Sequence, residues 1–258
     1  MTMSVVDEQK LPADSGAVTI GRHRYLRAPV PLHFPSEAEV PESKLHLELR
    51  TLLYQVLVRA FAAESSIGCD QFVYFDAANP RACLSPDAFV RLGEPDSKFK
   101  NWKVWERGAP QLAVEIVSAS DAHEEPWDVK FARYRQLGVA ELVRFDPLAE
   151  ERRLRVWDRV ADQLVERELV VSVAESNVLP GHWIEILHSE HGPSLRLSQD
   201  AEGTRLYPTE AEAQRAEAEA QRAEAEAQRA EAEAQRAEAE AALQRVRELE
   251  AELVRRQG

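Results

Sequence analysis

The chain has 258 residues, of which 44% are hydrophobic, so it can form one sizeable core with an extension. Its formal charge of −13 argues against broad, nonspecific nucleic-acid binding, because phosphate contacts need Lys or Arg. A local basic groove, or a metal ion that neutralises phosphate, is still compatible with that charge. Two cysteines, Cys69 and Cys83, argue against a disulfide framework. The chain has no run of about 18 apolar residues and no signal pattern, so we expect a cytoplasmic protein without a membrane span.

The N-terminal part of the chain changes character near residue 41. Residues 1–40 are rich in proline and weakly periodic, and we predict an arm with a short strand at Ala17–Ile20. Apolar residues recur at helical spacing from Glu42 to Ala63, which predicts a helix. Ser43 is its predicted N-cap, since the hydroxyl can accept a free backbone N–H group. This helix opens a folded domain that we assign to residues 41–200.

Short segments that favour β structure follow the helix. They are Phe72–Phe75, Ala82–Val90, Leu112–Val117 and Leu142–Phe145. Pro86, inside the second segment, marks an edge or a bulge, because proline cannot donate a hydrogen bond to a neighbouring strand. The third segment is almost wholly apolar, which is typical of a buried central strand.

A helix is predicted between the last two of these strands, at Trp127–Leu137, with Gly138 as its C-terminal cap. A helix that leads from one buried strand to the next predicts a crossover connection. Arg153–Asp158 and Gln163–Val171 then alternate polar and apolar residues, which predicts a β-hairpin.

The end of the chain has a different composition. We interpret residues 201–209 as a linker and residues 210–258 as a helical tail. The sequence AEAQRAE repeats there with a period of seven, and alanine is the best helix former, so a long helix is predicted. Alanine buries little area at a seam, so a coiled coil and a lone solvated helix both stay open. A more apolar seam, outside the alanine register, is formed by Leu243, Val246, Leu249 and Leu253.

Three charged residues are candidates for a functional site. Glu115 lies within the apolar strand, where a carboxylate is costly unless it is paired or binds a cation. Asp87 follows Pro86, and Lys130 lies on the next helix, whose start should lie near the end of the Glu115 strand. Carboxylates and water suit Mg²⁺ or Mn²⁺, so a metal ion is one explanation for Glu115. A structural ion pair with Arg or Lys is the other.

The order of helix, strands, Pro-Asp, Glu-bearing strand, helix and strand resembles the PD-(D/E)XK nuclease superfamily. More narrowly, it resembles the bacterial restriction-endonuclease branch called the Uma-two family. The resemblance runs from about Lys44 to Trp183, and its motifs are KVWERGAPQLAVEIVSAS, Lys130–Val139, Phe145–Pro147 and Leu179–Trp183. It implies an α/β fold with a restriction-endonuclease-like mixed sheet flanked by helices. It also implies an Mg²⁺-dependent endonuclease that hydrolyses phosphodiester bonds, with DNA as the expected partner.

The resemblance also implies roles for individual residues. Asp87 matches the metal ligand of the Pro-Asp motif and Glu115 matches the second ligand, with the backbone carbonyl of Ile116 completing the set. Val117 occupies the place of the usual superfamily lysine. In this branch the lysine is moved to the helix, which implies that Lys130 orients the attacking water or offsets charge in the transition state.

One position departs from the family pattern. The family usually has an aspartate four residues before this lysine, and here that position is Pro126. Asp128 or Glu125 could take its place. Glu48, on the first helix, could contact the metal ligands without binding the metal itself.

Other assignments compete with these. Pro95-Asp96 is a rival Pro-Asp pair, but a polar loop follows it, whereas Asp87 is flanked by strand-like residues, so we prefer Asp87. His46 is interpreted as a packing or capping group. For the whole chain, the alternative to an endonuclease is a catalytically inactive platform whose coiled-coil tail mediates oligomerisation or partner binding. We expect a homo-oligomer formed through the domain, the tail or both.

Overall fold

The computed structural model describes residues 18–20, 23–25, 43–118, 126–169, 172–189 and 192–257. Its helices are α1 (Lys44–Phe61), α2 (Val104–Arg107), α3 (Trp127–Leu137) and α4 (Glu210–Gln257). Its strands are β1 (Val18–Ile20), β2 (His23–Tyr25), β3 (Ser65–Gly68), β4 (Val73–Tyr74), β5 (Cys83–Leu84), β6 (Ala88–Leu92), β7 (Trp102–Lys103), β8 (Leu112–Ile116), β9 (Glu141–Phe145), β10 (Leu154–Val160), β11 (Gln163–Glu166), β12 (Val173–Glu175), β13 (His182–Ser189) and β14 (Gly192–Ser198). The short strand predicted near the N-terminus is confirmed by β1, which pairs with β2.

A six-stranded mixed sheet forms the centre of the domain. Its strand order is β11-β10-β9-β8-β6-β3. β8 and β9 are parallel, and every other neighbouring pair in this sheet is antiparallel. α3 lies in the connection between β8 and β9, so the predicted crossover is confirmed, as is the hairpin of β10 and β11. The expected α/β class with a mixed sheet flanked by helices is confirmed.

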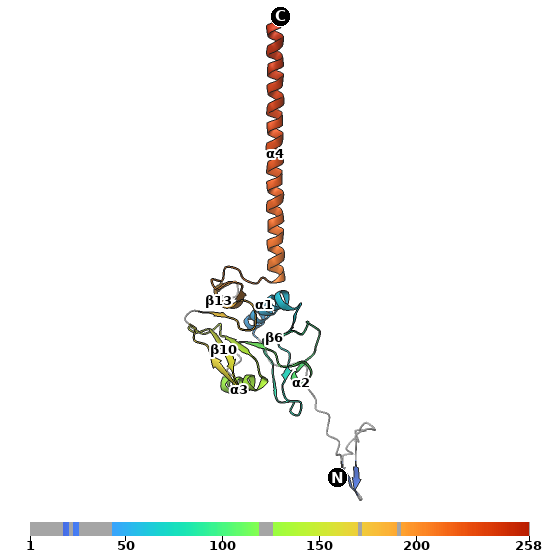
Figure 1. The fold of residues 1–258 in the computed structure, drawn as a ribbon, viewed down its shortest axis with the longest axis vertical. Helices are drawn as coiled ribbons and strands as arrows, with labels where there is room; N and C mark the ends of the chain where they lie inside the picture. Colours follow the sequence, from blue (N-terminus) through green and yellow to red (C-terminus); the bar gives the residue numbers. More distant parts are fainter. Residues whose placement is uncertain are drawn as a thin grey trace, which may run out of the picture.

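The side chains of β8 alternate between the two faces of this sheet. Leu112, Val114 and Ile116 pack in one core with α1 and the sheet of β12, β13 and β14. Ala113 packs in a second core with α3 and the small sheet of β4, β5 and β7. Figure 1 accordingly shows α1 and β13 on one side of the central strands and α3 on the other. Burial of apolar side chains on both faces is the main force that holds these layers together.

The segment Ala82–Val90, predicted as one β segment, is divided at Pro86. β5 lies before this proline and belongs to the small sheet, whereas β6 lies after it and belongs to the central sheet. The segment predicted at Phe72–Phe75 is β4, and it too belongs to the small sheet. Because proline has no N–H group, it cannot continue a strand ladder, and the chain changes sheets here. The change of sheet leaves Asp87 directly before β6.

Both predicted helix caps are present. Ser43 is the N-cap of α1, and its hydroxyl accepts a hydrogen bond from the His46 backbone N–H at 3.2 Å. Gly138 ends α3 with φ of 91° and ψ of 23°, a left-handed conformation that glycine adopts without a steric penalty. The end of α3 therefore depends on this glycine.

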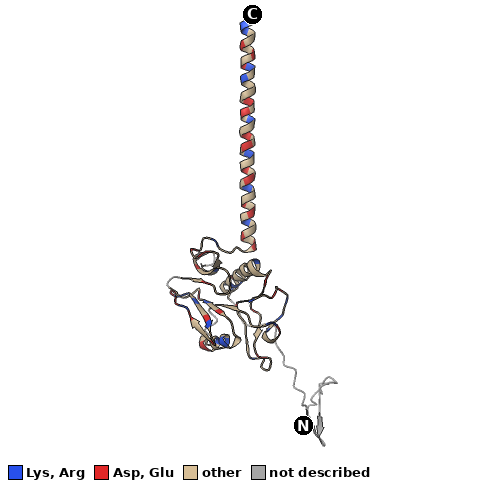
Figure 2. Cartoon of the chain, in the orientation of Figure 1, with Lys and Arg blue, Asp and Glu red and all other residues tan. Residues whose placement is uncertain are grey.

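The tail forms one helix, α4, of 48 residues, which confirms the predicted long helix. Figure 1 shows it projecting away from the domain, and Figure 2 shows acidic and basic residues alternating along it. Glutamines bond to glutamates four residues earlier, as Gln221 does to Glu217 at 3.3 Å. Among the described residues, no helix is long and apolar enough to cross a membrane.

The first turn of α4 is fastened to the domain. The Thr209 hydroxyl accepts a hydrogen bond from the Glu212 N–H, and the Glu212 carboxylate accepts one from the Thr209 N–H, which is a capping box. Arg196 of β14 donates two hydrogen bonds to the same carboxylate, at 3.0 and 2.9 Å. Arg59 of α1 pairs with Glu210 at 2.5 Å. The start of α4 is thus held by both α1 and β14.

Candidate active site

The pairing of β6 with β8 brings two carboxylates together. Ala88 lies opposite Val114 in this antiparallel pair, so the next positions outward are Asp87 and Glu115. Asp87 Oδ2 accepts a hydrogen bond from the Ile116 backbone N–H at 2.7 Å, which fixes that side chain against β8. Both carboxylates are buried, with 6% of Asp87 and 5% of Glu115 exposed. The structure therefore brings the two predicted carboxylates and Ile116 to one place.

Glu115 faces α3, because it shares the alternation of Ala113 on the strand. Lys130 of α3 donates to Glu115 Oε2 at 2.6 Å, and the hydroxyl of Tyr134 donates to Glu115 Oε1. Lys130 and Tyr134 are four residues apart, so they lie on one side of the helix. All three predicted site residues, Asp87, Glu115 and Lys130, thus belong to one cluster.

Burial dominates the electrostatics of this cluster. It raises the pKa of Glu115 from 4.5 to about 7, although Lys130 acts in the opposite direction and the charge of Asp87 adds to the increase. Burial and the charge of Glu115 also raise the pKa of Tyr134 well above its ordinary value, so the phenol stays protonated and remains a donor. Burial thus favours the neutral form of Glu115, whereas a nearby cation would favour its charged form.

Two residues of this cluster were missed by sequence reasoning. His46 Nε2 lies 2.9 Å from Asp87 Oδ1, so the first turn of α1 contacts the carboxylate pair. We interpreted His46 only as packing or capping, and no local pattern links it to Asp87, because tertiary packing alone joins α1 to β6. Tyr134 lies within the family motif Lys130–Val139, but no role was assigned to it from the sequence. Its spacing from Lys130 was the signal that could have identified it.

A basic residue lies beside Glu115 on the next strand. Arg144 of β9 is the register partner of Glu115. Its guanidinium lies 4.7 Å from the ring centroid of Trp127, on α3, so it lies on the same face of the sheet as Glu115. Lys130 and Arg144 therefore place two positive groups on the face of the sheet that holds Glu115.

Other residues considered in the sequence have the following positions and contacts. Asp128 is exposed in the first turn of α3, and Pro126 is the N-cap of that helix. Glu48 of α1 is half-buried and pairs with Lys44 at 3.5 Å. The rival Asp96 accepts a hydrogen bond from the Ile67 N–H at 3.2 Å, so it supports β3. Glu125 lies outside the described residues.

The cluster can be tested for its fit to a divalent metal ion. In the residues that the structure describes, no group of three or more His, Cys, Asp or Glu side chains is arranged to hold a metal. Mg²⁺, however, is usually bound through one or two carboxylates and keeps several waters. Asp87, Glu115 and the adjoining backbone of Ile116 offer that oxygen chemistry. These residues therefore fit a hydrated Mg²⁺ or Mn²⁺, and they do not form an all-protein cage.

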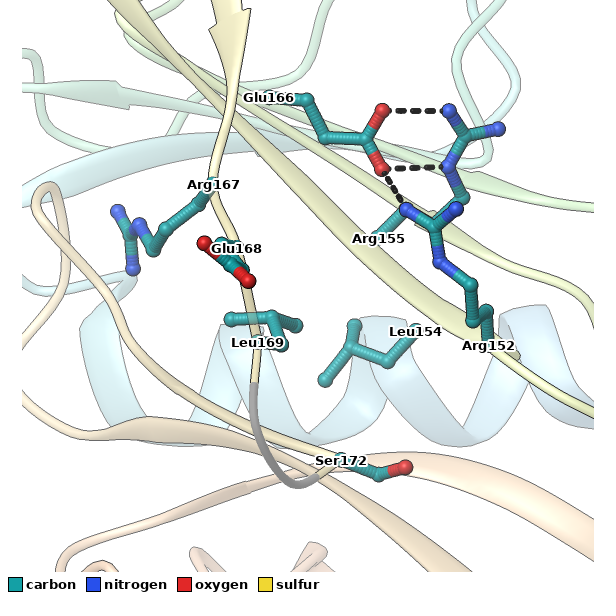
Figure 3. A pocket seen from close by; sticks show the side chains of 8 residues that line it. All are labelled: Arg152, Leu154, Arg155, Glu166, Arg167, Glu168, Leu169 and Ser172. Atoms are coloured by element: carbon teal, nitrogen blue, oxygen red, sulfur yellow. Dashed lines mark hydrogen bonds and ion pairs between the residues drawn. The ribbon is translucent and has the colours of Figure 1, made fainter.

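A pocket of about 520 Å³ lies away from this cluster, between β10, β11 and the segment after β11. Figure 3 shows Glu166 held by Arg155 and Arg152 within it. Arg167 pairs with Asp158 at 2.6 Å. The guanidinium groups of this pocket are thus already matched with carboxylates of the chain. The lining residues are Arg152, Leu154, Arg155, Glu166, Arg167, Glu168, Leu169 and Ser172.

The fold and the cluster together define a class of protein. A mixed sheet carries a carboxylate after Pro86 and a second one on the adjacent buried strand, and the crossover helix supplies a lysine. This is the arrangement of the PD-(D/E)XK nuclease superfamily, with the lysine on the helix.

Comparison with known proteins identifies the family within that class. The model of the Uma2 family, described as "Putative restriction endonuclease", matches residues 37–187, more than half of the chain, and the chain belongs to this family. Among solved structures, the crystal structure of "a putative nuclease belonging to DUF820" from Anabaena variabilis ATCC 29413 is similar. That match has a TM-score of 0.38 and 13% identity, and it covers 54% of this chain and 74% of the other. No curated protein matches the chain.

Proposed function

We propose that the chain is an Mg²⁺- or Mn²⁺-dependent endonuclease that hydrolyses phosphodiester bonds in DNA. The observation that carries the proposal is the buried pair of Asp87 and Glu115 with Lys130 at 2.6 Å from Glu115. Membership of a family described as restriction endonucleases supports a nuclease. A phosphodiester brings a negative charge to the site, and Lys130 and Arg144 are placed to offset it.

Each residue of the cluster has a proposed part. Asp87, Glu115 and the Ile116 carbonyl would hold the metal ion, which when bound would supply a more acidic water and offset charge on the phosphate. Lys130 would move from the Glu115 carboxylate toward the reacting phosphate. Tyr134 would keep Glu115 oriented, and His46 would do the same for Asp87. The structure contains the contacts of Lys130 and Tyr134 with Glu115 and the contact of His46 with Asp87.

Incubation of supercoiled plasmid with the protein and Mg²⁺, Mn²⁺ or EDTA tests the proposal. We expect nicked and linear products with either metal and none with EDTA. Glu115→Gln and Asp87→Asn should lower cleavage to background, because both remove a ligand charge at nearly constant volume. Asp162→Asn is the matched control, since Asp162 is exposed in the turn between β10 and β11. Cleavage that survives Glu115→Gln would rule out this site.

A second candidate function is the inactive platform. Both Glu115 oxygens already accept hydrogen bonds, from Lys130 and Tyr134, and this self-contained arrangement favours a structural role. Titration of the wild-type protein with Mn²⁺ separates the two functions. Binding that Glu115→Gln abolishes supports the endonuclease. Lack of both binding and cleavage supports the platform.

A further inference from the structure

The segment Ser97–Arg107 is basic within an acidic chain. Its sequence, SKFKNWKVWER, holds four basic residues and one acidic residue, whereas the whole chain has a formal charge of −13. Aromatic residues alternate with the basic ones. Nucleic-acid-binding surfaces combine these two features, because basic groups contact phosphates and aromatic rings stack on bases.

Buried aromatic rings fix the path of this segment. Trp102 is fully buried, and its indole N–H donates to the Gly108 carbonyl at 2.8 Å. Phe99 packs edge to face on Trp102 with ring centroids 5.1 Å apart, and Phe89 of β6 packs on both rings. Arg107 lies over the Trp102 ring at 5.1 Å. The segment is therefore ordered before any ligand arrives, which reduces the entropy cost of binding.

Several side chains of the segment face solvent. Lys98 and Lys100 are exposed on either side of the inward Phe99. Trp105 of α2 has 42% of its surface exposed, which is unusual for so large an aromatic residue. Lys103 is paired with Glu106 at 3.1 Å, so the charge offered to a ligand comes mainly from Lys98 and Lys100.

This segment adjoins the candidate active site. Phe89, which contacts Phe99 and Trp102, lies two residues after Asp87 on β6. Trp102 and Tyr134 belong to one core, on the face of the sheet that holds Glu115. In addition, β7 of the segment and β5, which leads to Asp87, belong to one small sheet, and β5 contacts α3. A strand of nucleic acid on the segment would thus lie near the carboxylates.

We propose that Ser97–Arg107 is a DNA-binding strip in which Lys98 and Lys100 contact phosphates and Trp105 stacks on an unpaired base. The inference rests on the proposed nuclease function and deepens it, because it names the preferred form of the substrate. A stacking tryptophan needs a base whose face is open, which a duplex interior does not offer. The favoured substrate is DNA with a single-stranded stretch.

Fluorescence anisotropy with a labelled single-stranded oligonucleotide, and with the same sequence as duplex, tests the strip. The full chain is used in EDTA, so that binding is measured without cleavage. Trp105→Ala should weaken single-strand binding at least about fivefold and duplex binding much less, with Trp105→Phe between the two. The double change Lys98→Ala and Lys100→Ala should weaken binding to both, and should reduce the salt slope for the single strand by about 1.4.

Two control variants match these changes in chemistry. Arg229→Ala removes an exposed charge from α4, and Leu148→Ala removes an exposed apolar side chain from the loop after β9. Neither should change the affinity or the salt slope by more than the error. If Trp105→Ala weakened the affinity for single strand and duplex equally, the proposed stacking of Trp105 on a base would be wrong. A double lysine variant that binds like Arg229→Ala would overturn the strip itself.

The outcome is separable from that of the proposed function. Plasmid cleavage that is intact in the strip variants, with unchanged affinity, contradicts the strip and leaves the endonuclease standing. Binding that depends on Trp105 and the two lysines, in a protein that cleaves nothing with either metal, supports the strip and contradicts the endonuclease.

Discussion

Glu115 combines three environments in one side chain. It is buried in a strand, it adjoins the like charge of Asp87, and it accepts hydrogen bonds from Lys130 and Tyr134. The first two conditions favour its neutral form and the last favours its charged form. The pKa of Glu115 lies above its ordinary value because desolvation is the largest of these effects. The charge state of Glu115 therefore depends on how burial and the charge of Asp87 compare with the hydrogen bonds from Lys130 and Tyr134.

The stability of the protein should depend on pH through Glu115. Its pKa rises from 4.5 to about 7 on folding, so between these values the folded state holds a proton that the unfolded chain has lost. The free energy of unfolding should therefore contain a part that decreases as pH rises across this window. In the variant Glu115→Gln the side chain cannot ionise, so this pH-dependent part of the free energy of unfolding is absent.

Urea unfolding in EDTA, at about pH 5 and about pH 8, measures this dependence. Relative to the wild type, Glu115→Gln should become less destabilising, or more stabilising, at the higher pH. Asp162→Asn provides the control, because Asp162 is exposed and its substitution should shift stability equally at both values. A constant difference between Glu115→Gln and wild type would contradict the raised pKa.

The hydroxyl of Tyr134 should matter for metal binding. Tyr134→Phe keeps the buried ring and removes the donor to Glu115 Oε1. Groups that orient metal ligands typically contribute about 10- to 100-fold in metal affinity, so we expect a loss of that size in a Mn²⁺ titration. Tyr207→Phe removes a hydroxyl that donates to the Pro180 carbonyl at 2.8 Å, and it should leave the affinity unchanged. Equal affinities for the two variants would exclude a role for Tyr134.

The elements differ in how directly the sequence predicts them. α1 and α3 have periodic apolar residues and recognisable caps, and both lie within two residues of the predicted bounds. The short strands β4 and β5 were predicted as strands, but their membership of a second sheet was not. Short strands carry too little pattern to indicate a partner, because pairing is decided by contacts between distant segments.

The capping box should stabilise the first turn of α4. Thr209→Ala removes the hydroxyl that accepts the Glu212 N–H, which should lower the free energy of unfolding by about 1 kcal/mol. Hydrogen exchange of the first-turn amides should increase as well, since the turn frays. Thr51→Ala, at an exposed position inside α1, is the control and should not destabilise. Unchanged exchange in Thr209→Ala would show that Arg196 and Arg59 alone hold the turn.

At the scale of the whole molecule, the chain consists of a folded domain followed by the repeat-containing helix α4. Its far end exposes a set of large apolar side chains, namely Leu243, Val246, Leu249, Leu253 and Val254. Such side chains favour association with a second copy, whereas the alanine repeat before them contributes little area. The expectation of a homo-oligomer through the tail follows from this seam.

Removal of the tail should therefore reduce the number of subunits in the assembly. We expect light scattering to give an oligomer for the full chain and a monomer for a chain that ends at Tyr207. Leu249→Glu and Leu253→Glu in the full chain should have the same effect, because both place a charge in the seam. Arg229→Ala controls for a change elsewhere on α4. An unchanged number of subunits after truncation would show that the tail does not mediate assembly.

The sequence by itself determined the α/β class, the crossover between β8 and β9, the long tail helix and the three charged residues Asp87, Glu115 and Lys130. The crossover and the tail helix follow from periodicity and caps, and Glu115 follows from a carboxylate in an apolar strand. The α/β class and the roles of Asp87 and Lys130 were implied by the resemblance to a nuclease family. Only the tertiary structure decided that His46 meets Asp87, that Asp96 supports β3 and that Tyr134 completes the Glu115 contacts. Those contacts join segments distant in sequence, and packing between layers brings them together.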